Sequence, residues 1–386
     1  MQLTILMPCL NEAETLATCI RKAHQGAEKA GLSGDDYEVL IADNGSTDGS
    51  QAIAQAEGAR LIHVPVRGYG AALIAGIEHA CGEFVLMGDS DDSYDFAAIK
   101  PFVDALNEGY ELVMGTRLKG EIKPGAMPFL HQYLGNPVLT FLGNVLFSTG
   151  MSDFHCGLRG FRRDAIQRLD LQTTGMEFAS EMVIRSSLAD LKRTEIPITL
   201  YPDGRSRPPH LRTWRDGWRH LQFMLLYSPK WVFILPGVIL LLLSSMVTIV
   251  LLFGPVSIGG TVFDVHTLIV AAAVMLNSIQ FILMGLLAIV FTARQHMLPP
   301  MRWTEWLVDN FSLGLGLIVS SLLIASGLAI YGVQFLRWSS VDFGPLNYQE
   351  TIRPIVLGTI FFVVGIQTFF WSFMVSLLNI STRSRL

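Results

Sequence analysis

The sequence predicts two fold classes in one chain: an α/β domain with a mostly parallel sheet, then a domain of membrane-spanning helices. Over residues 1–115, short apolar runs alternate with helical periodicity. Repeated strand–helix–strand units of this kind form a parallel sheet with helices on both faces. After residue 230, four apolar stretches each exceed the roughly 20 residues that cross the hydrocarbon core of a bilayer.

The distribution of charge supports this division. Residues 1–200 carry 16 Lys and Arg against 26 Asp and Glu, whereas residues 201–230 carry 6 against 2. A basic segment therefore separates an acidic domain from an apolar one. We expect an α/β domain over 1–210, an amphipathic interfacial helix over 211–230 and a four-helix membrane domain over 231–386.

The elements follow in order along the first domain. Ligands of parallel sheets bind outside the carboxyl ends of the strands, so the segments after the strands are where a site is expected. The strands are expected at 3–7, 38–42, 60–64, 84–87, 111–114 and 192–200, and the helices at 14–30, 70–80 and 96–107, with a further short helix after residue 49.

The fourth predicted strand, Phe84–Met87, is followed at once by carboxylates. Alternate residues of a strand point to the same side, so Asp89 and Asp91 would share one small volume and raise each other's pKa. A divalent cation, Mg²⁺ or Mn²⁺, would offset that repulsion. The alternative is that these acidic residues cap the next helix, as we expect of Asp95.

A calcium loop of the EF-hand type is excluded by two positions. Tyr94 stands where such a loop requires glycine, and Lys100 stands where it requires glutamate. The loop after the first strand, Pro8–Glu12, has no glycine, so the dinucleotide-binding fingerprint is absent. The loop Asp43–Gly49 either forms a plain Asx turn or places Asp43 to accept hydrogen bonds from a base or ribose.

These motifs together resemble the inverting glycosyltransferases of family two, which have the GT-A fold. The shared patterns are Pro-x-x-Asn-Glu at residue 8, Asp-x-Gly-Ser-x-Asp-Gly at residue 43 and Asp-x-Asp at residue 89. Further on, Gly115–Arg117, Asp153–Arg159 and Gly175–Phe178 resemble the polyprenyl- and dolichyl-phosphate sugar synthases. The resemblance covers roughly the first 230 residues.

The resemblance implies a site with a divalent metal on Asp89 and Asp91. It makes Asp91 catalytic, places Arg117 and Arg159 on the acceptor phosphate, and has Asp153 orient those arginines or the sugar. The residues expected to bind the nucleotide-sugar are Pro8, Asn11, Glu12, Asp43, Asp48, Gly68, Asp89, Ser90, Arg205 and Arg207.

The chain departs from the family's pattern at three places. Asn44 stands where the family often has a second aspartate, and Ser93 stands where some members supply a Gln to the metal. The family's Gly-x-Ser-Lys-Leu loop is replaced by Gly204–Leu211, so either Arg205 or Arg207 is the arginine that binds the diphosphate.

The implied reaction transfers a hexose from a UDP- or GDP-sugar to a polyprenyl phosphate, with inversion at the anomeric carbon. Three alternatives stay open. Gln334–Trp338 matches the Gln-x-x-Arg-Trp signature of processive polysaccharide synthases. A transporter or flippase with a nucleotide-binding domain is the non-enzymatic alternative, and a nucleotidyltransferase is the other enzyme. The expected partners are the donor, the lipid acceptor and membrane lipid, with no nucleic acid; homo-oligomerisation stays open.

Membrane contact is expected from three features. The apolar run 127–147 is either a core helix or a membrane-facing acceptor element. Trp214 and Trp218 recur at helical spacing beside Arg215 and Arg219, as in a helix lying in the bilayer interface. The spans are expected at 231–253, 266–291, 311–335 and 355–380. Their connections follow the positive-inside rule if the catalytic domain and both termini are cytoplasmic, at a bacterial plasma membrane.

Overall fold

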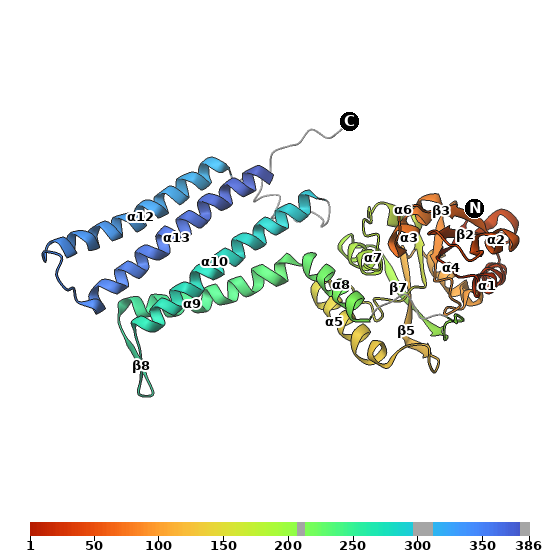
Figure 1. Ribbon diagram of the computed structural model, residues 1–386, viewed down its shortest axis with the longest axis horizontal. Helices are drawn as coiled ribbons and strands as arrows, with labels where there is room; N and C mark the ends of the chain where they lie inside the picture. The colour runs from red at the N-terminus through yellow and green to blue at the C-terminus, as the bar shows by residue number, and fades with distance from the viewer. Residues whose placement is uncertain (207–212, 296–311, 379–386) are drawn as a thin grey trace. The chain divides into compact units, whose positions relative to one another are not determined.

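The computed structural model describes residues 1–206, 213–295 and 312–378, and the chain forms two compact units, Met1–Met224 and Leu225–Leu386. Figure 1 shows the elements of both units. The candidate site lies in the first unit, and the helices long enough to cross a membrane lie in the second.

The first unit is built on a seven-stranded sheet in the order β3-β2-β1-β4-β6-β5-β7. All neighbouring strands pair in parallel except β6, which is antiparallel to both β4 and β5. The sheet is thus mostly parallel, and the expected α/β fold class is confirmed. The strands are β1 Leu3–Cys9, β2 Tyr37–Asp43, β3 Arg60–His63, β4 Phe84–Met87, β5 Leu112–Ile122, β6 Arg159–Arg162 and β7 Arg193–Leu200.

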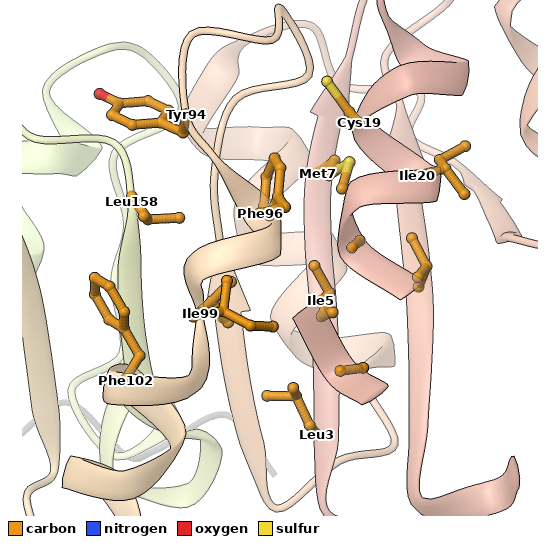
Figure 2. Packing of buried hydrophobic residues seen from close by; sticks show 14 of the residues in the cluster. Leu3, Ile5, Met7, Cys19, Ile20, Tyr94, Phe96, Ile99, Phe102 and Leu158 are labelled. Carbon is orange, nitrogen blue, oxygen red and sulfur yellow. The ribbon is translucent and has the colours of Figure 1, made fainter. Parts of the chain in front are cut away.

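Helices cover both faces of this sheet because side chains of a strand alternate between its faces. Leu3, Ile5 and Met7 of β1 point to one face, where they pack with α1 and with the segment around Phe96 (Figure 2). Leu6 points to the other face and lies against Gly76 of α3. The helices of this unit are α1 Leu16–Lys29, α2 Ser50–Ala56, α3 Tyr69–His79, α4 Lys100–Asn107, α5 Asn136–Phe147, α6 Arg163–Gln167, α7 Phe178–Leu188 and α8 Thr213–Leu226.

Two details of this unit differ from the sequence-based expectation. Strand β6 was not predicted, because Arg159–Arg162 has no apolar alternation and was interpreted only as the end of a motif. The predicted helix over 96–107 begins as a 3₁₀ turn, Phe96–Ala98, before α4. Asp95 accepts a hydrogen bond from the Ala97 amide at 3.0 Å, so its predicted role as a helix cap is confirmed.

The second unit contains four helices that are long and apolar enough to cross a membrane, within the described residues. They match the four predicted spans. The helices are α9 Leu235–Phe253, which continues a π-helical turn at Lys230–Ile234, α10 Val265–Arg294, α12 Leu313–Ser339 and α13 Tyr348–Leu378; a hairpin of β8 Val256–Ile258 and β9 Thr261–Phe263 joins the first two.

Small residues bring α12 and α13 into close contact, and the two helices run side by side in Figure 1. A Cβ atom on Gly327 would lie 2.8 Å from the carbonyl oxygen of Gly358, and Ser320 is fully buried. Small residues therefore lie at this helix–helix interface, as they do in many membrane proteins.

Candidate active site

A cavity of about 680 Å³ opens at the carboxyl ends of β1, β2 and β4. This is where ligands of parallel sheets bind. Of the sequence-predicted site residues that the structure describes, eight line it: Pro8, Asn11, Glu12, Gly68, Asp89, Ser90, Asp91 and Arg205. Five described residues, Asp43, Asp48, Arg117, Asp153 and Arg159, are absent from its lining, and Arg207 lies outside the described residues.

The loops after β1 and β2 are tied together at the cavity wall. Asn11 has a left-handed backbone, with φ of 59°, and its side-chain oxygen accepts a hydrogen bond from the Thr47 amide at 2.7 Å. Asparagine tolerates this conformation better than most residues. Ser90 donates a hydrogen bond to the Pro8 carbonyl at 2.8 Å, which joins the β1 loop to the β4 loop. Three segments distant in sequence thus form one rim.

The acidic pair after β4 has the electrostatics that the sequence predicts. Burial, together with the charge of Asp91, raises the pKa of Asp89 to about 6. The Tyr69 hydroxyl donates a hydrogen bond to Asp89 Oδ1 at 2.9 Å and favours the ionised form. The carboxylates therefore lie close enough to repel, which is the condition under which a divalent cation binds favourably.

Arg205 reaches the same cluster from the segment after β7. Its guanidinium lies 2.8 Å from Asp91 Oδ2, 2.8 Å from Asp203 Oδ2 and 3.2 Å from Glu12 Oε1. The Gly204 amide donates to the Asp91 carbonyl at 2.9 Å and holds the two segments together. Burial would lower the pKa of Arg205, but hydrogen bonding to Asp203 and the charges of Asp91 and Glu12 raise it instead. The positive charge of Arg205 thus offsets part of the negative charge of three carboxylates.

The donor set fits a metal held jointly by protein and substrate. In the part of the chain that the structure describes, no three His, Cys, Asp or Glu side chains form a group able to hold a metal ion. Mg²⁺ commonly uses one or two carboxylates, several waters and the phosphates of a substrate. Asp89 and Asp91 could supply the protein ligands, and the excess negative charge around Arg205 favours a cation at this position.

Gly157 places the Asp153–Arg159 segment against the acidic pair. A Cβ atom on Gly157 would lie 2.7 Å from Asp89 Oδ2 and 3.2 Å from the Tyr94 hydroxyl oxygen. The Gly157 amide donates to that hydroxyl at 2.9 Å. A residue without a side chain is needed here because the Asp89 carboxylate occupies the space.

Arg117 and Asp153 form a buried, bidentate ion pair beside the site. Arg117 Nε lies 2.7 Å from Asp153 Oδ2, Arg117 Nη2 lies 2.8 Å from Oδ1, and the Arg117 amide also donates to Oδ2 at 3.0 Å. Burial would raise the pKa of Asp153, but the hydrogen bonds and charge of Arg117 lower it. Asp153 is therefore an ionised partner that orients Arg117, one of the roles expected for it.

Arg159 is fully buried and donates hydrogen bonds to main-chain carbonyl oxygens. It donates to Cys156 at 2.8 Å, Ala179 at 2.8 Å and Phe154 at 3.2 Å. Neither Arg159 nor Arg117 lines the cavity. Arg159 fixes its own turn to α7, and Arg117 is held by Asp153 while its charge still lowers the pKa of Asp89. The expected role of both guanidinium groups on the acceptor phosphate stays a prediction.

Asp43 and Asp48 hold the β2 loop through hydrogen bonds, among them one from the Ser50 amide to Asp48 at 3.0 Å that forms an Asx turn. Asp43 accepts from the Ser46 amide at 3.1 Å and from Gln51 at 2.7 Å; burial would raise its pKa, but these bonds lower it. Asp48 accepts from the Ala13 amide at 2.9 Å. Asp43 also borders a second cavity, of about 400 Å³, with Gly45, Gln51, His63, Val64 and Pro65. Gly45 lines both cavities.

Sequence reasoning missed several lining residues. Tyr69, Gly175 and Met176 meet at the cavity because the loop at Gly68 packs against Thr174, whose carbonyl oxygen would lie 2.1 Å from a Cβ on Gly68. Arg215 and Arg219 of α8 also line the cavity, although the sequence was interpreted as placing them at a bilayer surface. The i, i+4 spacing of Arg215 and Arg219 can be read from the sequence, but the cavity that they line cannot.

Family comparisons agree with this geometry. The model described as glycosyl transferase family 2 matches residues 4–170, and the glycosyltransferase family 2 C-terminal transmembrane region matches residues 286–379. The chain is also 36% identical over 383 residues to the low-salt glycan biosynthesis hexosyltransferase Agl6 of Haloferax volcanii, covering 98% of this chain and 89% of that protein. The chain belongs to glycosyltransferase family 2, and it is a membrane-bound glycosyltransferase.

Other relatives match between half and three fifths of the chain. A dolichyl-phosphate hexose transferase of Haloferax volcanii is 29% identical over 199 residues, covering 51% of this chain and 81% of that protein. Among solved structures, glucosyl-3-phosphoglycerate synthase of Mycobacterium tuberculosis, in complex with Mn²⁺ and UDP, is similar with 22% identity and a TM-score of 0.46, covering 59% of this chain and 79% of that one. Membership of family 2 sets aside the nucleotidyltransferase and the non-enzymatic transporter.

Proposed function

We propose that this enzyme transfers a hexose from a nucleotide-sugar to a polyprenyl phosphate, forming a polyprenyl-phospho-monosaccharide. The observation that carries the proposal is the cavity of the first unit, where an acidic pair and Arg205 lie together in a chain that also has four apolar helices of membrane-spanning length. Two relatives, a hexosyltransferase and a dolichyl-phosphate hexose transferase, support the sugar class and the acceptor class.

The donor would bind with its diphosphate at the acidic pair and its nucleoside toward the β2 loop. Gly45 lines both cavities, so a nucleotide could extend from the first cavity into the second, where Asp43 and His63 lie. A bound Mg²⁺ or Mn²⁺, held by Asp91 and Asp89, would supply electrostatic stabilisation of the leaving diphosphate. Arg205 would supply further positive charge from the protein itself.

The chemistry requires little proton transfer. An oxygen of the acceptor phosphate attacks the anomeric carbon as the bond from that carbon to the donor's diphosphate oxygen breaks, and in-line attack inverts the configuration. A phosphate monoester has a second pKa of about 6, so the nucleophile is already largely ionised at neutral pH. The protein's task is therefore to align two anionic groups and to stabilise the charge that develops on the nucleoside diphosphate.

An apolar surface on the first unit suits a lipid acceptor. Phe129, Tyr133 and Phe141, from the π-helical turn His131–Gly135 and its flanking segments, are 77%, 63% and 65% exposed. A monomeric soluble domain rarely exposes so many large apolar side chains together. We assign this surface to the bilayer, where it would guide the polyprenyl tail. A cytoplasmic catalytic domain at a bacterial plasma membrane, with both termini on that side, remains our prediction.

One observation disfavours the polysaccharide synthase. In the second unit, Trp338 of the Gln-x-x-Arg-Trp match packs edge-on against Phe343, with ring centroids 4.9 Å apart, and donates a hydrogen bond to the Gly344 carbonyl at 3.2 Å. Gln334 is buried within the same unit. These contacts give Trp338 a structural role at the end of α12, which is the role of an anchoring residue and not of a sugar-binding one.

The test uses the full chain in nanodiscs with undecaprenyl phosphate, Mn²⁺ and a panel of radiolabelled UDP- and GDP-hexoses. We expect one donor to give a lipid-extractable product with a single sugar, which mild acid releases. A water-insoluble or high-molecular-weight polymer would instead favour the processive synthase. Transfer to water alone, with no lipid product from any donor, would contradict the proposal.

A further inference from the structure

We propose that Arg215 and Arg219 of α8 form a phosphate-binding pair in the active-site cavity, an inference that rests on the proposed function. Both residues line the same cavity as Asp89 and Asp91. Residues four apart on a helix lie on one face, so the two guanidinium groups can act on one ligand. Guanidinium forks match the oxygens of phosphate geometrically, and this pairing is stronger than a neutral hydrogen bond.

Arg215 and Arg219 form an arginine stripe on one side of α8, and another side of this helix is anchored to the first unit. His220 is buried, and its Nδ1 lies 2.8 Å from the Ser180 hydroxyl of α7. Its ring also packs edge-on against His155, with centroids 4.6 Å apart. Met224, one turn further on, is fully buried. These contacts fix the rotation of α8, so the direction of Arg215 and Arg219 toward the cavity follows from packing.

The remaining side of α8 is apolar and exposed. Trp214 and Trp218 are 77% and 58% exposed. With 3.6 residues per turn, the buried stripe of His220 and Met224, the arginine stripe and this tryptophan stripe occupy three different sides of α8. The helix therefore presents a cationic stripe and an aromatic stripe on the two sides that are not packed. A phosphate that carries an apolar chain combines the same two properties.

The charges of the cavity are arranged for two anionic groups. Arg205 is engaged by three carboxylates, as described above, and Arg219 Nε lies 3.9 Å from Glu177 Oε1. Arg117 and Arg159 are instead committed to Asp153 and to main-chain carbonyls. The structure thus assigns phosphate recognition to α8.

The phosphate could come from the donor's diphosphate or from the lipid acceptor, and two probes separate these sources. The full chain in nanodiscs is titrated with UDP in the presence of Mn²⁺, and separately with farnesyl phosphate, a soluble polyprenyl phosphate. The variants are Arg215→Ala with Arg219→Ala, and Arg219→Lys alone. Arg21→Ala is the matched control, because Arg21 is 62% exposed and pairs with Glu57 at 2.9 Å away from the cavity lining.

We expect the double variant to weaken farnesyl phosphate binding by roughly tenfold or more, because charge-assisted hydrogen bonds are lost. Arg219→Lys should lose part of this affinity, and Arg21→Ala none of it. A loss confined to UDP would still support the pair but assign it to the donor. Unchanged affinity for both probes, in variants with the native melting temperature, would overturn the inference, as would a native chain that binds neither probe.

The transfer assay distinguishes this failure from failure of the proposed function. If the native chain makes no lipid-linked sugar from any donor, the proposed function fails, whereas the two binding titrations still test the arginine pair. If the native chain makes the product and the double variant keeps the native KM for undecaprenyl phosphate and for the donor, only the arginine pair is refuted.

Discussion

Two charged clusters a short distance apart in the fold have opposite designs. The cluster of Asp89, Asp91 and Arg205 lines a cavity and carries more carboxylates than cations, and the pKa of Asp89 rises to about 6 as a result. The pair of Arg117 and Asp153 is buried, balanced in charge and bidentate. The first arrangement costs stability and gains a ligand site, whereas the second maintains the geometry beside it. The sequence motifs alone predicted a functional role for both clusters.

The largest effect is expected on enzyme activity, from a substitution in the acidic cluster at the cavity. Asp91→Asn should lower kcat by about a hundredfold or more, because the carboxylate that would hold the metal ion beside the leaving diphosphate is lost. Its melting temperature should change little, since Asp91 lies at the cavity. The measurement is initial rate with and without EDTA, with Asp104→Asn of the exposed Lys100–Asp104 pair as control. Full activity of native protein in EDTA would remove the metal from the mechanism.

The second prediction concerns stability. Asp153→Asn should destabilise the first unit by about 3–5 kcal/mol, because it leaves the Arg117 charge buried without its partner. Glu57→Gln, in the exposed pair with Arg21, should cost far less, because solvent screens the two charges. Denaturant unfolding followed by intrinsic fluorescence measures both. Equal losses of unfolding free energy in the two variants would show that the buried pair stabilises the fold no more than the exposed pair does.

The pH dependence of that loss has a defined sign. The folded protein holds the pKa of Asp153 below its ordinary value, so the pair's stabilisation is fully present above the unfolded pKa of about 4. It is lost as pH falls from there through the lower folded-state pKa. Native protein should therefore lose stability over this acidic window more steeply than Asp153→Asn. A variant that retains the native pH slope would contradict this assignment.

A smaller effect is expected where the Asp153–Arg159 segment contacts the acidic pair. Gly157→Ala places a Cβ atom 2.7 Å from Asp89 Oδ2, so the carboxylate must move. We expect activity to fall by roughly tenfold, the size of effect that displacing a catalytic group by less than 1 Å produces. Gly332→Ala is a suitable control, because no described atom lies within 4 Å of its added Cβ. Native activity in Gly157→Ala would show that Asp89 needs no fixed position.

The smallest expected effect is a shift along the pH axis. The Tyr69 hydroxyl stabilises the ionised form of Asp89, so Tyr69→Phe should raise the pKa of Asp89 further above about 6. The acidic limb of the kcat/KM profile should move upward by less than about one pH unit, since a single hydrogen bond is worth about 1 kcal/mol. Tyr37→Phe, whose hydroxyl contacts His24, is the control. A downward shift would contradict the assignment.

Much of this architecture was predictable because local patterns carry it. The strand Phe84–Met87 was predicted with the bounds that the structure has, since four apolar residues end at glycine and carboxylates. The four spans were predictable because apolar stretches of that length have few other uses in a protein. Strand β6 was not predictable in the same way, because Arg159–Arg162 is held by pairing to β4 and β5 rather than by its own propensity.

By itself, the sequence determined the fold class, the four apolar spans and the acidic pair at the end of a strand, because each depends on spacing within a few residues. Only the tertiary structure decided which arginines meet the cavity. Arg117 and Arg159 do not line it and are held by partners that lie 36 and up to 20 residues along the chain, and Arg215 and Arg219 reach it through the packing of His220 on Ser180. A guanidinium binds whichever anion or carbonyl the fold brings within reach, and that choice is made in three dimensions.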